Sequence, residues 1–189
     1  MSDAFITLGL PRRAALEQDA LQNAYAAQSR TVHPDHGGDE ILAAEVNAAY
    51  ETLRNPDKRL KHLMDLAAPE AAKQWRTVPM DEAMMGLFSE LGKALEASAR
   101  FIERKAKAQT SLAKALLANE EMAQRESLER IGFELEHRRT GMEALLPGLD
   151  AALNASDASV WKQLGVMQAK FAYLARWRTQ VRERLLALM

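Results

Sequence analysis

Apolar residues in the second half of the chain recur at spacings of three, four or seven, over segments far longer than an ordinary helix. Such spacing places the residues on one face of an α-helix and does not fit a strand. Three runs predict three long helices, and an antiparallel arrangement would bury all three apolar faces. The runs are Met84, Phe88, Leu91, Leu95, Ile102 and Ala106, continuing weakly to Leu112 and Leu116; Leu128, Ile131, Leu135, Met142 and Leu145; and Trp161, Leu164, Met167, Phe171, Leu174, Val181, Leu185 and Leu188.

The residue types agree with this periodicity. Ala, Leu, Glu, Gln, Lys and Arg dominate, and runs of β-branched residues are nearly absent, so helix propensity is high throughout. The sequence therefore predicts an all-α protein. We expect an N-terminal helical domain over residues 1–66, a linker over 67–79, and a three-helix bundle over 80–189. Pro147 and Gly148 are expected to end the second long helix.

The N-terminal segment predicts shorter helices around one loop. Helices are expected at about 17–32 and 39–54, and a further short one at 56–66 begins with a proline, which suits a first turn. Residues 33–38 read His-Pro-Asp-His-Gly-Gly. The proline disfavours helix at the residue before it, and two glycines follow, so this stretch is a loop.

Several classes of protein are excluded or disfavoured. The chain has no cysteine, which excludes disulfides and thiolate-ligated zinc or iron–sulfur sites within it. Its net charge of −1 lacks the basic footprint of a nucleic-acid binder. No stretch approaches the ~20 apolar residues of a membrane span, and no catalytic triad, phosphate loop or paired-carboxylate site stands out. We expect a soluble cytoplasmic protein that is not an enzyme and needs no cofactor or metal.

Two motifs in the N-terminal segment coincide. The first is His33-Pro34-Asp35, in the loop between two predicted helices. The second is Asn47-x-Ala49-Tyr50-x-x-Leu53-x-Asn55-Pro56-x-x-Arg59, over the next helix and its exit. Together they resemble the J-domain family. The resemblance covers about residues 3–66, and includes the opening Phe5-Ile6-Thr7-Leu8-Gly9-Leu10 and Tyr25.

The resemblance implies that this segment stimulates ATP hydrolysis by an Hsp70 chaperone of the HscA or DnaK type. In the family, the tripeptide His33-Pro34-Asp35 would contact the Hsp70. A proline stiffens the backbone, so the flanking histidine and aspartate would be presented at low entropic cost. The full set of Hsp70-binding residues that we predict is His33, Pro34, Asp35, Arg30, Tyr25, Asn47, Lys58 and Arg59.

One departure from the family pattern concerns the helix before the loop. J-domains usually carry several lysines or arginines on the exposed face of this helix. Here Arg30 is the only basic residue among residues 25–32. Fewer positive charges weaken long-range steering toward an acidic partner. Either the partner is specialised or the rest of the interface compensates.

Several segments along the chain resemble the iron–sulfur co-chaperone family HscB. The region after the predicted J-domain lacks the Gly/Phe-rich linker and zinc-binding cysteine pairs of general-purpose J-proteins. The similar segments are Leu8-Gly9-Leu10-Pro11, Thr52-Leu53-Arg54-x-Pro56-x-x-Arg59-x-x-x-Leu63, and Trp161 followed by Lys170-Phe171-Ala172-Tyr173-Leu174 and Arg182-x-Arg184-Leu185-Leu186. This resemblance implies a second partner, the cluster scaffold protein IscU, bound by Met84, Met85, Phe88 and Tyr173.

Alternatives stay open at each of these sites. Methionine and phenylalanine at helical spacing suit a core as well as a partner surface, and Tyr173 competes with neighbouring apolar residues for the core. A metal cluster of His33, Asp35, His36 and Asp39 is disfavoured because no second shell would orient it. The chain could also be a J-protein with a different client, or a helical adaptor whose J-domain has lost its Hsp70 contact.

Overall fold

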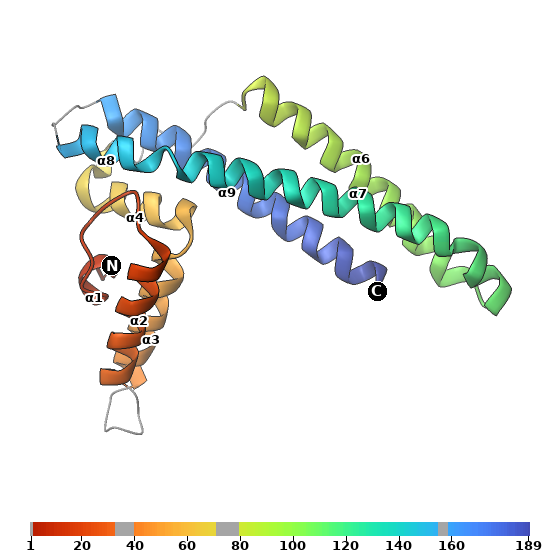
Figure 1. Cartoon of the computed structure of the whole chain (residues 1–189), viewed down its shortest axis with the longest axis horizontal. Coiled ribbons are helices and arrows are strands. Elements are labelled where there is room, and N and C mark those ends of the chain that lie inside the picture. Colours follow the sequence, from red (N-terminus) through yellow and green to blue (C-terminus); the bar gives the residue numbers. More distant parts are fainter. Residues whose placement is uncertain (1, 33–39, 71–79, 155–158) are drawn as a thin grey trace. The chain divides into compact units, whose positions relative to one another are not determined.

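The computed structural model describes residues 2–32, 40–70, 80–154 and 159–189. Every regular element in these ranges is a helix, which confirms the all-α prediction. None of the described helices is long and apolar enough to cross a membrane. The helices are α1 (Ala4–Thr7), α2 (Gln18–Val32), α3 (Glu40–Leu53), α4 (Pro56–Ala67), α6 (Glu82–Lys107), α7 (Ser111–Glu143), α8 (Leu146–Asn154) and α9 (Ser159–Leu188) (Figure 1).

Local chemistry sets several helix ends. The carboxylate of Asp3 accepts from the backbone N–H groups of Phe5 and Ile6, which caps the start of α1. Gly9 follows α1 with a φ of 67°, a left-handed conformation that glycine adopts without steric cost. Pro56 occupies the first turn of α4, as expected, where its missing N–H costs no hydrogen bond.

The chain folds into two compact units, which we describe separately. The first consists of Met1–Val78 and Met142–Ala172, and the second of Pro79–Gly141 and Tyr173–Met189. Helix α9 contributes its first half to one unit and its second half to the other. The linker predicted over 67–79 lies largely outside the described residues, and the predicted domain boundaries remain predictions.

In the first unit, α2 and α3 form an antiparallel pair (Figure 1). Phe5 and Leu8 from the opening turn are almost completely buried against this pair and α4, with exposed fractions of 0% and 2%. The same hydrophobic core continues into α8 and the first half of α9, through Leu146, Val160, Leu164 and Phe171. Residues far apart in the sequence therefore share one core.

Helix α8 corrects the expectation for Pro147 and Gly148. The long helix α7 already ends at Glu143, and Pro147 lies in the first turn of a new helix, α8. A proline ends a helix only when it falls in the interior; in the first turn its ring is compatible with helix. The sequence reasoning therefore missed a short helix that follows α7 almost directly.

The second unit contains α6, α7 and the second half of α9. Its buried residues include Leu87, Leu91 and Phe101 of α6, Leu128, Ile131 and Leu135 of α7, and Leu174, Trp177, Val181 and Leu188 of α9. The core face predicted for α7 is confirmed at Leu128, Ile131 and Leu135, but Leu145 lies beyond the end of the helix and is 61% exposed. For α6 it was partly wrong: Leu87 is buried, whereas Phe88 is 52% exposed.

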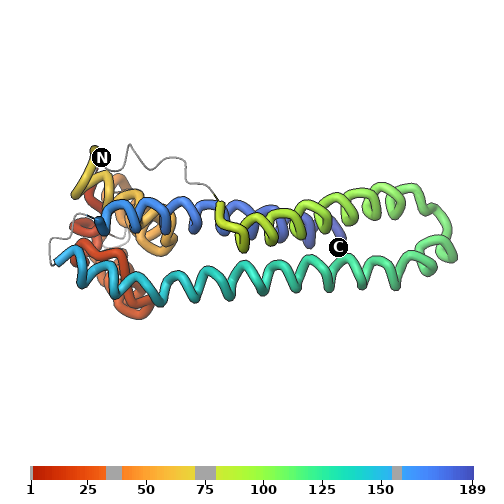
Figure 2. Tube along the Cα trace, turned by 90° about the horizontal axis from the view of Figure 1, so that it is seen from above, coloured from red at the N-terminus to blue at the C-terminus, as the bar shows by residue number. Residues whose placement is uncertain are grey.

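The break between α6 and α7 was also missed. Leu112 and Leu116, predicted to continue the first long helix, lie in α7, because α6 ends at Lys107. The hydroxyl oxygen of Thr110 accepts from the backbone N–H of Ala113 at 3.1 Å, which caps the new helix. Figure 2 shows the turn that joins the two helices. A cap-forming threonine followed by serine was the available sequence signal.

Candidate functional site

The predicted Hsp70-binding residues centre on the pair formed by α2 and α3. Helix α2 ends at Val32 and α3 begins at Glu40, so the motif His33-Pro34-Asp35 lies between them, outside the described residues. The alternative metal cluster that shares this stretch also lies outside them. The described residues therefore define the helices on either side of the motif.

Tyr25 and Asn47 meet across the two helices. The hydroxyl of Tyr25 donates to the side-chain oxygen of Asn47 at 2.7 Å, and its ring stacks on that of Tyr50 with centroids 4.3 Å apart. The guanidinium of Arg54 lies 5.8 Å from the Tyr50 centroid, within the range of a cation–π contact. These contacts hold α2 and α3 in a defined register, and thereby position the ends that carry the motif.

Arg30 and Lys58 lie on the surface of the first unit. Arg30 is exposed in the last turn of α2, where a positive charge complements the helix dipole, and its Nε donates to the carbonyl oxygen of Ala26 at 3.1 Å. Lys58 is exposed on α4. Both residues are placed where a partner could reach them.

Arg59 is not on that surface, which corrects its assignment as a partner contact. Its side chain is 5% exposed. Its Nε donates to the carbonyl oxygen of Ala14 at 2.8 Å, and one terminal nitrogen donates to that of Leu53 at 2.7 Å. A buried guanidinium is stable only when its donors are satisfied. Arg59 therefore ties α4 to the end of α3 and to the segment before α2.

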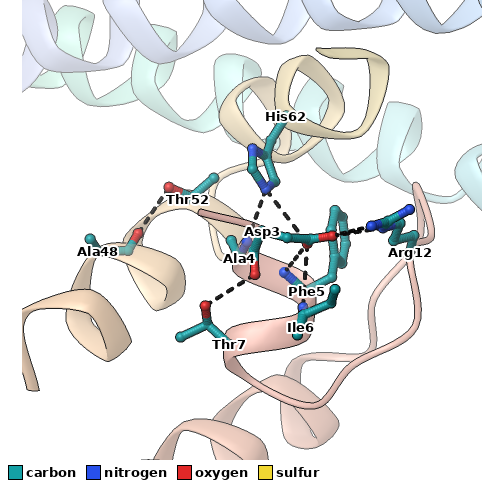
Figure 3. Close-up of polar contacts among 9 residues, drawn as sticks. All are labelled: Asp3, Ala4, Phe5, Ile6, Thr7, Arg12, Ala48, Thr52 and His62. Atoms are coloured by element: carbon teal, nitrogen blue, oxygen red, sulfur yellow. Dashed lines mark hydrogen bonds and ion pairs between the residues drawn. The ribbon is translucent and has the colours of Figure 1, made fainter. Parts of the chain in front are cut away.

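A second buried polar cluster joins α4 to the start of α1 (Figure 3). His62 is 4% exposed, and its Nε2 accepts a hydrogen bond from the backbone N–H of Ala4 at 3.0 Å. The Nε of Arg12 donates to the carboxylate of Asp3 at 2.7 Å. The same carboxylate, through its other oxygen, lies 3.9 Å from His62. The sequence reasoning did not single out His62, because a lone histidine in a helix carries no distinguishing pattern.

The pKa values in this cluster are shifted. Burial lowers the pKa of His62 because it disfavours the charged imidazolium, and this outweighs the opposing charges of Asp3 and Asp65. For Asp3, burial raises the pKa, but the hydrogen bonds from Arg12, Ile6 and Phe5 favour the carboxylate and leave the pKa lowered. A neutral histidine therefore accepts from Ala4 beside an ionised aspartate.

The four predicted client-binding residues lie in the second unit and differ in how far they are exposed. Met84 is 3% exposed and belongs to the core, which corrects its assignment to a partner surface. Met85 and Phe88 are 58% and 52% exposed on α6. Tyr173, at the start of the α9 segment in this unit, is partly exposed.

Trp177 brings two of these residues together. The centroid of its ring lies 5.7 Å from that of Phe88 and 5.9 Å from that of Tyr173, distances typical of aromatic pairs. Trp177 itself is 3% exposed. A buried tryptophan thus supports two more exposed aromatic rings from different helices, and Met85 extends the apolar surface along α6. We call Met85, Phe88 and Tyr173 the aromatic patch.

Comparisons with known proteins agree with both resemblances. Residues 3–62 match the DnaJ domain family. The chain is 34% identical over 92 residues to a co-chaperone protein HscB homolog of Chromobacterium violaceum, a match that covers 43% of this chain and 53% of the relative. It is 28% identical over 85 residues to the co-chaperone protein HscB of Proteus mirabilis, covering 40% of this chain and 49% of the relative. The chain thus spans about half the length of these relatives.

Three further matches follow. One covers the DnaJ domain alone, and two are solved structures that match nearly the whole chain. A chaperone protein DnaJ of Bifidobacterium longum is 46% identical over 61 residues, which cover 31% of this chain and 16% of the relative. The structure of HscB from Vibrio cholerae matches with a TM-score of 0.57 at 20% identity, covering 96% of each chain. Human HscB matches with a TM-score of 0.50 at 17% identity, covering 95% of this chain and 84% of the other. At such identities the likeness concerns the fold.

Proposed function

From the premise that this chain is a J-domain protein with an HscB-like fold, we propose that it is a co-chaperone that stimulates ATP hydrolysis by an Hsp70. The observation that carries the proposal is the DnaJ match over residues 3–62, which contains His33-Pro34-Asp35 between two paired helices. The Tyr25–Asn47 hydrogen bond supports it, because it joins the two helices between which the motif lies in the sequence.

The ATP hydrolysis rate of the Hsp70 from the same source tests this proposal. Wild type should raise the steady-state rate, and His33→Gln should leave it at the basal value. The control is Glu103→Gln, which also introduces a glutamine, at an exposed position on α6. A wild-type chain without effect would favour the alternative of a helical adaptor, which the single basic residue of α2 suggests. Equal stimulation by His33→Gln would also overturn the co-chaperone proposal.

We further propose that the second unit delivers a client, the iron–sulfur scaffold protein IscU, through the aromatic patch. The supporting observations are the similarity to HscB relatives and the position of Phe88 and Tyr173 around Trp177. Exposed aromatic side chains on a rigid support are frequent centres of binding energy, because they bury a large area at low entropic cost. Met84 is not part of this proposal.

Titration of the scaffold protein tests the client proposal. Phe88→Ala and Tyr173→Ala should each weaken binding by about tenfold or more, the cost of truncating a central contact. Leu186→Ala is the matched control, because Leu186 is a 57% exposed apolar residue of α9 outside the aromatic patch. Absence of binding, or binding that is insensitive to both aromatic variants, would indicate a different client or a different site.

A further inference from the structure

Helix α7 carries large apolar side chains on two opposite faces. The inner face packs in the second unit through Leu128, Ile131 and Leu135. The outer side carries four large apolar side chains that no described part of the unit covers, with exposed fractions of 72% for Leu112, 75% for Leu116, 60% for Met122 and 79% for Phe133. One exposed apolar residue is ordinary, whereas several along one helix mark an interaction surface.

Leu112, Leu116 and Phe133 belong to a row of exposed residues with an alternating spacing of four and three, and Met122 lies outside this row. We call this set the outer stripe: Leu112, Leu116, Asn119, Ala123, Glu126, Arg130, Phe133, His137 and Thr140, all of them exposed. At 1.5 Å per residue it extends for about 42 Å along the helix. In a coiled coil, residues with an average spacing of 3.5 positions form the seam along which two helices pack. The outer stripe therefore has the geometry of a helix–helix contact.

We propose that the outer stripe is a homodimer surface, on which α7 of a second copy of this chain packs antiparallel. The charges of the outer stripe carry the argument. Glu126 and Arg130 lie one turn apart with opposite signs, and in the described part of the chain neither forms an ion pair. If the two-fold axis lies level with Leu128, Glu126 of each copy faces Arg130 of the other. One symmetric contact then forms two ion pairs, and each of the four charges has one partner.

Two further layers of the same register are also complementary, whereas Leu116 faces Thr140. Phe133 faces Ala123 of the second copy, which sets a large side chain against a small one. His137 faces Asn119, and these two can share a hydrogen bond. A shift by one heptad in either direction would separate Glu126 from Arg130 of the other copy: Glu126 would face His137 or Ala123, and Arg130 would face Phe133 or Asn119. The loss of both ion pairs therefore disfavours both shifted registers.

The chemistry of the outer stripe distinguishes a second copy from a membrane surface. Helices that lie on membranes combine a continuous apolar face with lysine and arginine on the polar face. Here the middle of the apolar side carries Glu126, an anion that anionic lipid headgroups would repel. Because polar layers interrupt the apolar ones, the dimer should be weak, and its population should rise with protein concentration.

Sedimentation velocity of the full chain over a range of concentrations tests the proposal. Wild type should shift from monomer to dimer as concentration rises. Glu126→Arg and Arg130→Glu should each raise the dimer Kd by about tenfold or more, because each creates two like-charge contacts in the homodimer. Circular dichroism should show that both variants remain folded, since both positions are exposed.

Mixing the two variants tests the register. In an equimolar mixture, one copy carries positive charges at both positions and the other carries negative charges at both. Each facing pair in the heterodimer then has opposite signs, so dimer should reappear. Glu103→Arg makes the same change as Glu126→Arg at an exposed position on α6, and it should dimerise like wild type.

Three outcomes would each overturn the proposal: a wild-type chain that stays monomeric, single variants that dimerise normally, or a mixture that stays monomeric. Monomeric wild type whose binding to anionic vesicles is lost in Phe133→Ala would assign the outer stripe to a membrane instead.

Discussion

The carboxylate of Asp150 accepts a 2.7 Å hydrogen bond from the backbone N–H of Ala14, a residue 136 positions earlier in the chain. Its other oxygen accepts from the N–H of Ala15 at 2.9 Å. The carbonyl oxygen of Ala14 in turn accepts from Arg59. A single short segment before α2 is thus held from two sides, by α8 and by α4, within the first unit.

Asp150→Ala should destabilise the chain by about 1–3 kcal/mol, because it leaves two partly buried N–H groups without their acceptor. Urea unfolding followed by circular dichroism measures the loss. Glu45→Ala removes a carboxylate from an exposed position on α3 and should change stability by less than about 0.5 kcal/mol. Equal stability of Asp150→Ala and wild type would show that this contact contributes little to folding.

Arg59→Lys should lower the unfolding free energy by about 2–4 kcal/mol. Lysine keeps the charge but cannot reach the carbonyl oxygens of both Ala14 and Leu53 with the fixed geometry of a guanidinium. Arg54→Lys is the matched control: Arg54 forms an exposed ion pair with Glu51, and such pairs contribute under about 1 kcal/mol. If the two substitutions cost the same, the burial of Arg59 has no energetic consequence.

Stability should fall as the pH drops from neutral through the ordinary histidine range. The pKa of His62 is lower in the folded protein than the ordinary 6.5, so the unfolded chain binds a proton more readily. The contribution of His62 is therefore fully present above the unfolded pKa and is lost as pH falls below it. The charged groups that act on His62 are Asp3 and Asp65, which raise its pKa, and Lys61 and Arg12, which lower it.

Urea midpoints at about pH 7.5 and pH 5.5 measure this dependence. His62→Gln should flatten it, because the glutamine side chain carries an oxygen acceptor and does not titrate. His137→Gln, at an exposed position on α7, should keep the wild-type dependence. A His62→Gln protein that loses as much stability between the two pH values as wild type would assign the acid sensitivity to other groups.

Comparison of Trp177→Ala with Phe88→Ala should distinguish the buried residue that supports the aromatic patch from a residue that lies on the patch itself. Truncating a buried tryptophan leaves a cavity and should cost about 3–5 kcal/mol of stability. Phe88 is half exposed, so its truncation should cost much less, about 1 kcal/mol or under. Thermal unfolding compares the two. A larger loss of stability for Phe88→Ala would place Phe88 in the core rather than on the patch.

Local signals in the sequence were sufficient for α2, α3 and α4 and for the match to the DnaJ domain family. Proline and glycine at residues 33–38 marked the gap between α2 and α3, and Pro56 marked the start of α4, because both residue types restrict the backbone wherever they stand. The tripeptide His33-Pro34-Asp35 and the motif from Asn47 to Arg59 identified the DnaJ domain. All of these depend on neighbours within a few positions.

Periodicity could not determine which helix face is buried. Leu87 and Phe88 both suit the apolar face of α6, yet Leu87 is 4% exposed and Phe88 52% exposed. The choice depends on where α7 and α9 lie around α6. The same holds for α7, whose outer residues Leu112 and Phe133 have the spacing of core residues but lie on the side away from the unit's core.

The sequence by itself determined that the chain is helical and that its N-terminal segment matches the DnaJ domain family, because helix propensity and a contiguous motif act over short distances. Only the tertiary structure decided that Arg59 is buried, that His62 accepts from Ala4, and that Asp150 holds the segment before α2. Each of these depends on two groups, distant in the chain, that folding brings within hydrogen-bond distance. No local pattern along the chain encodes that distance.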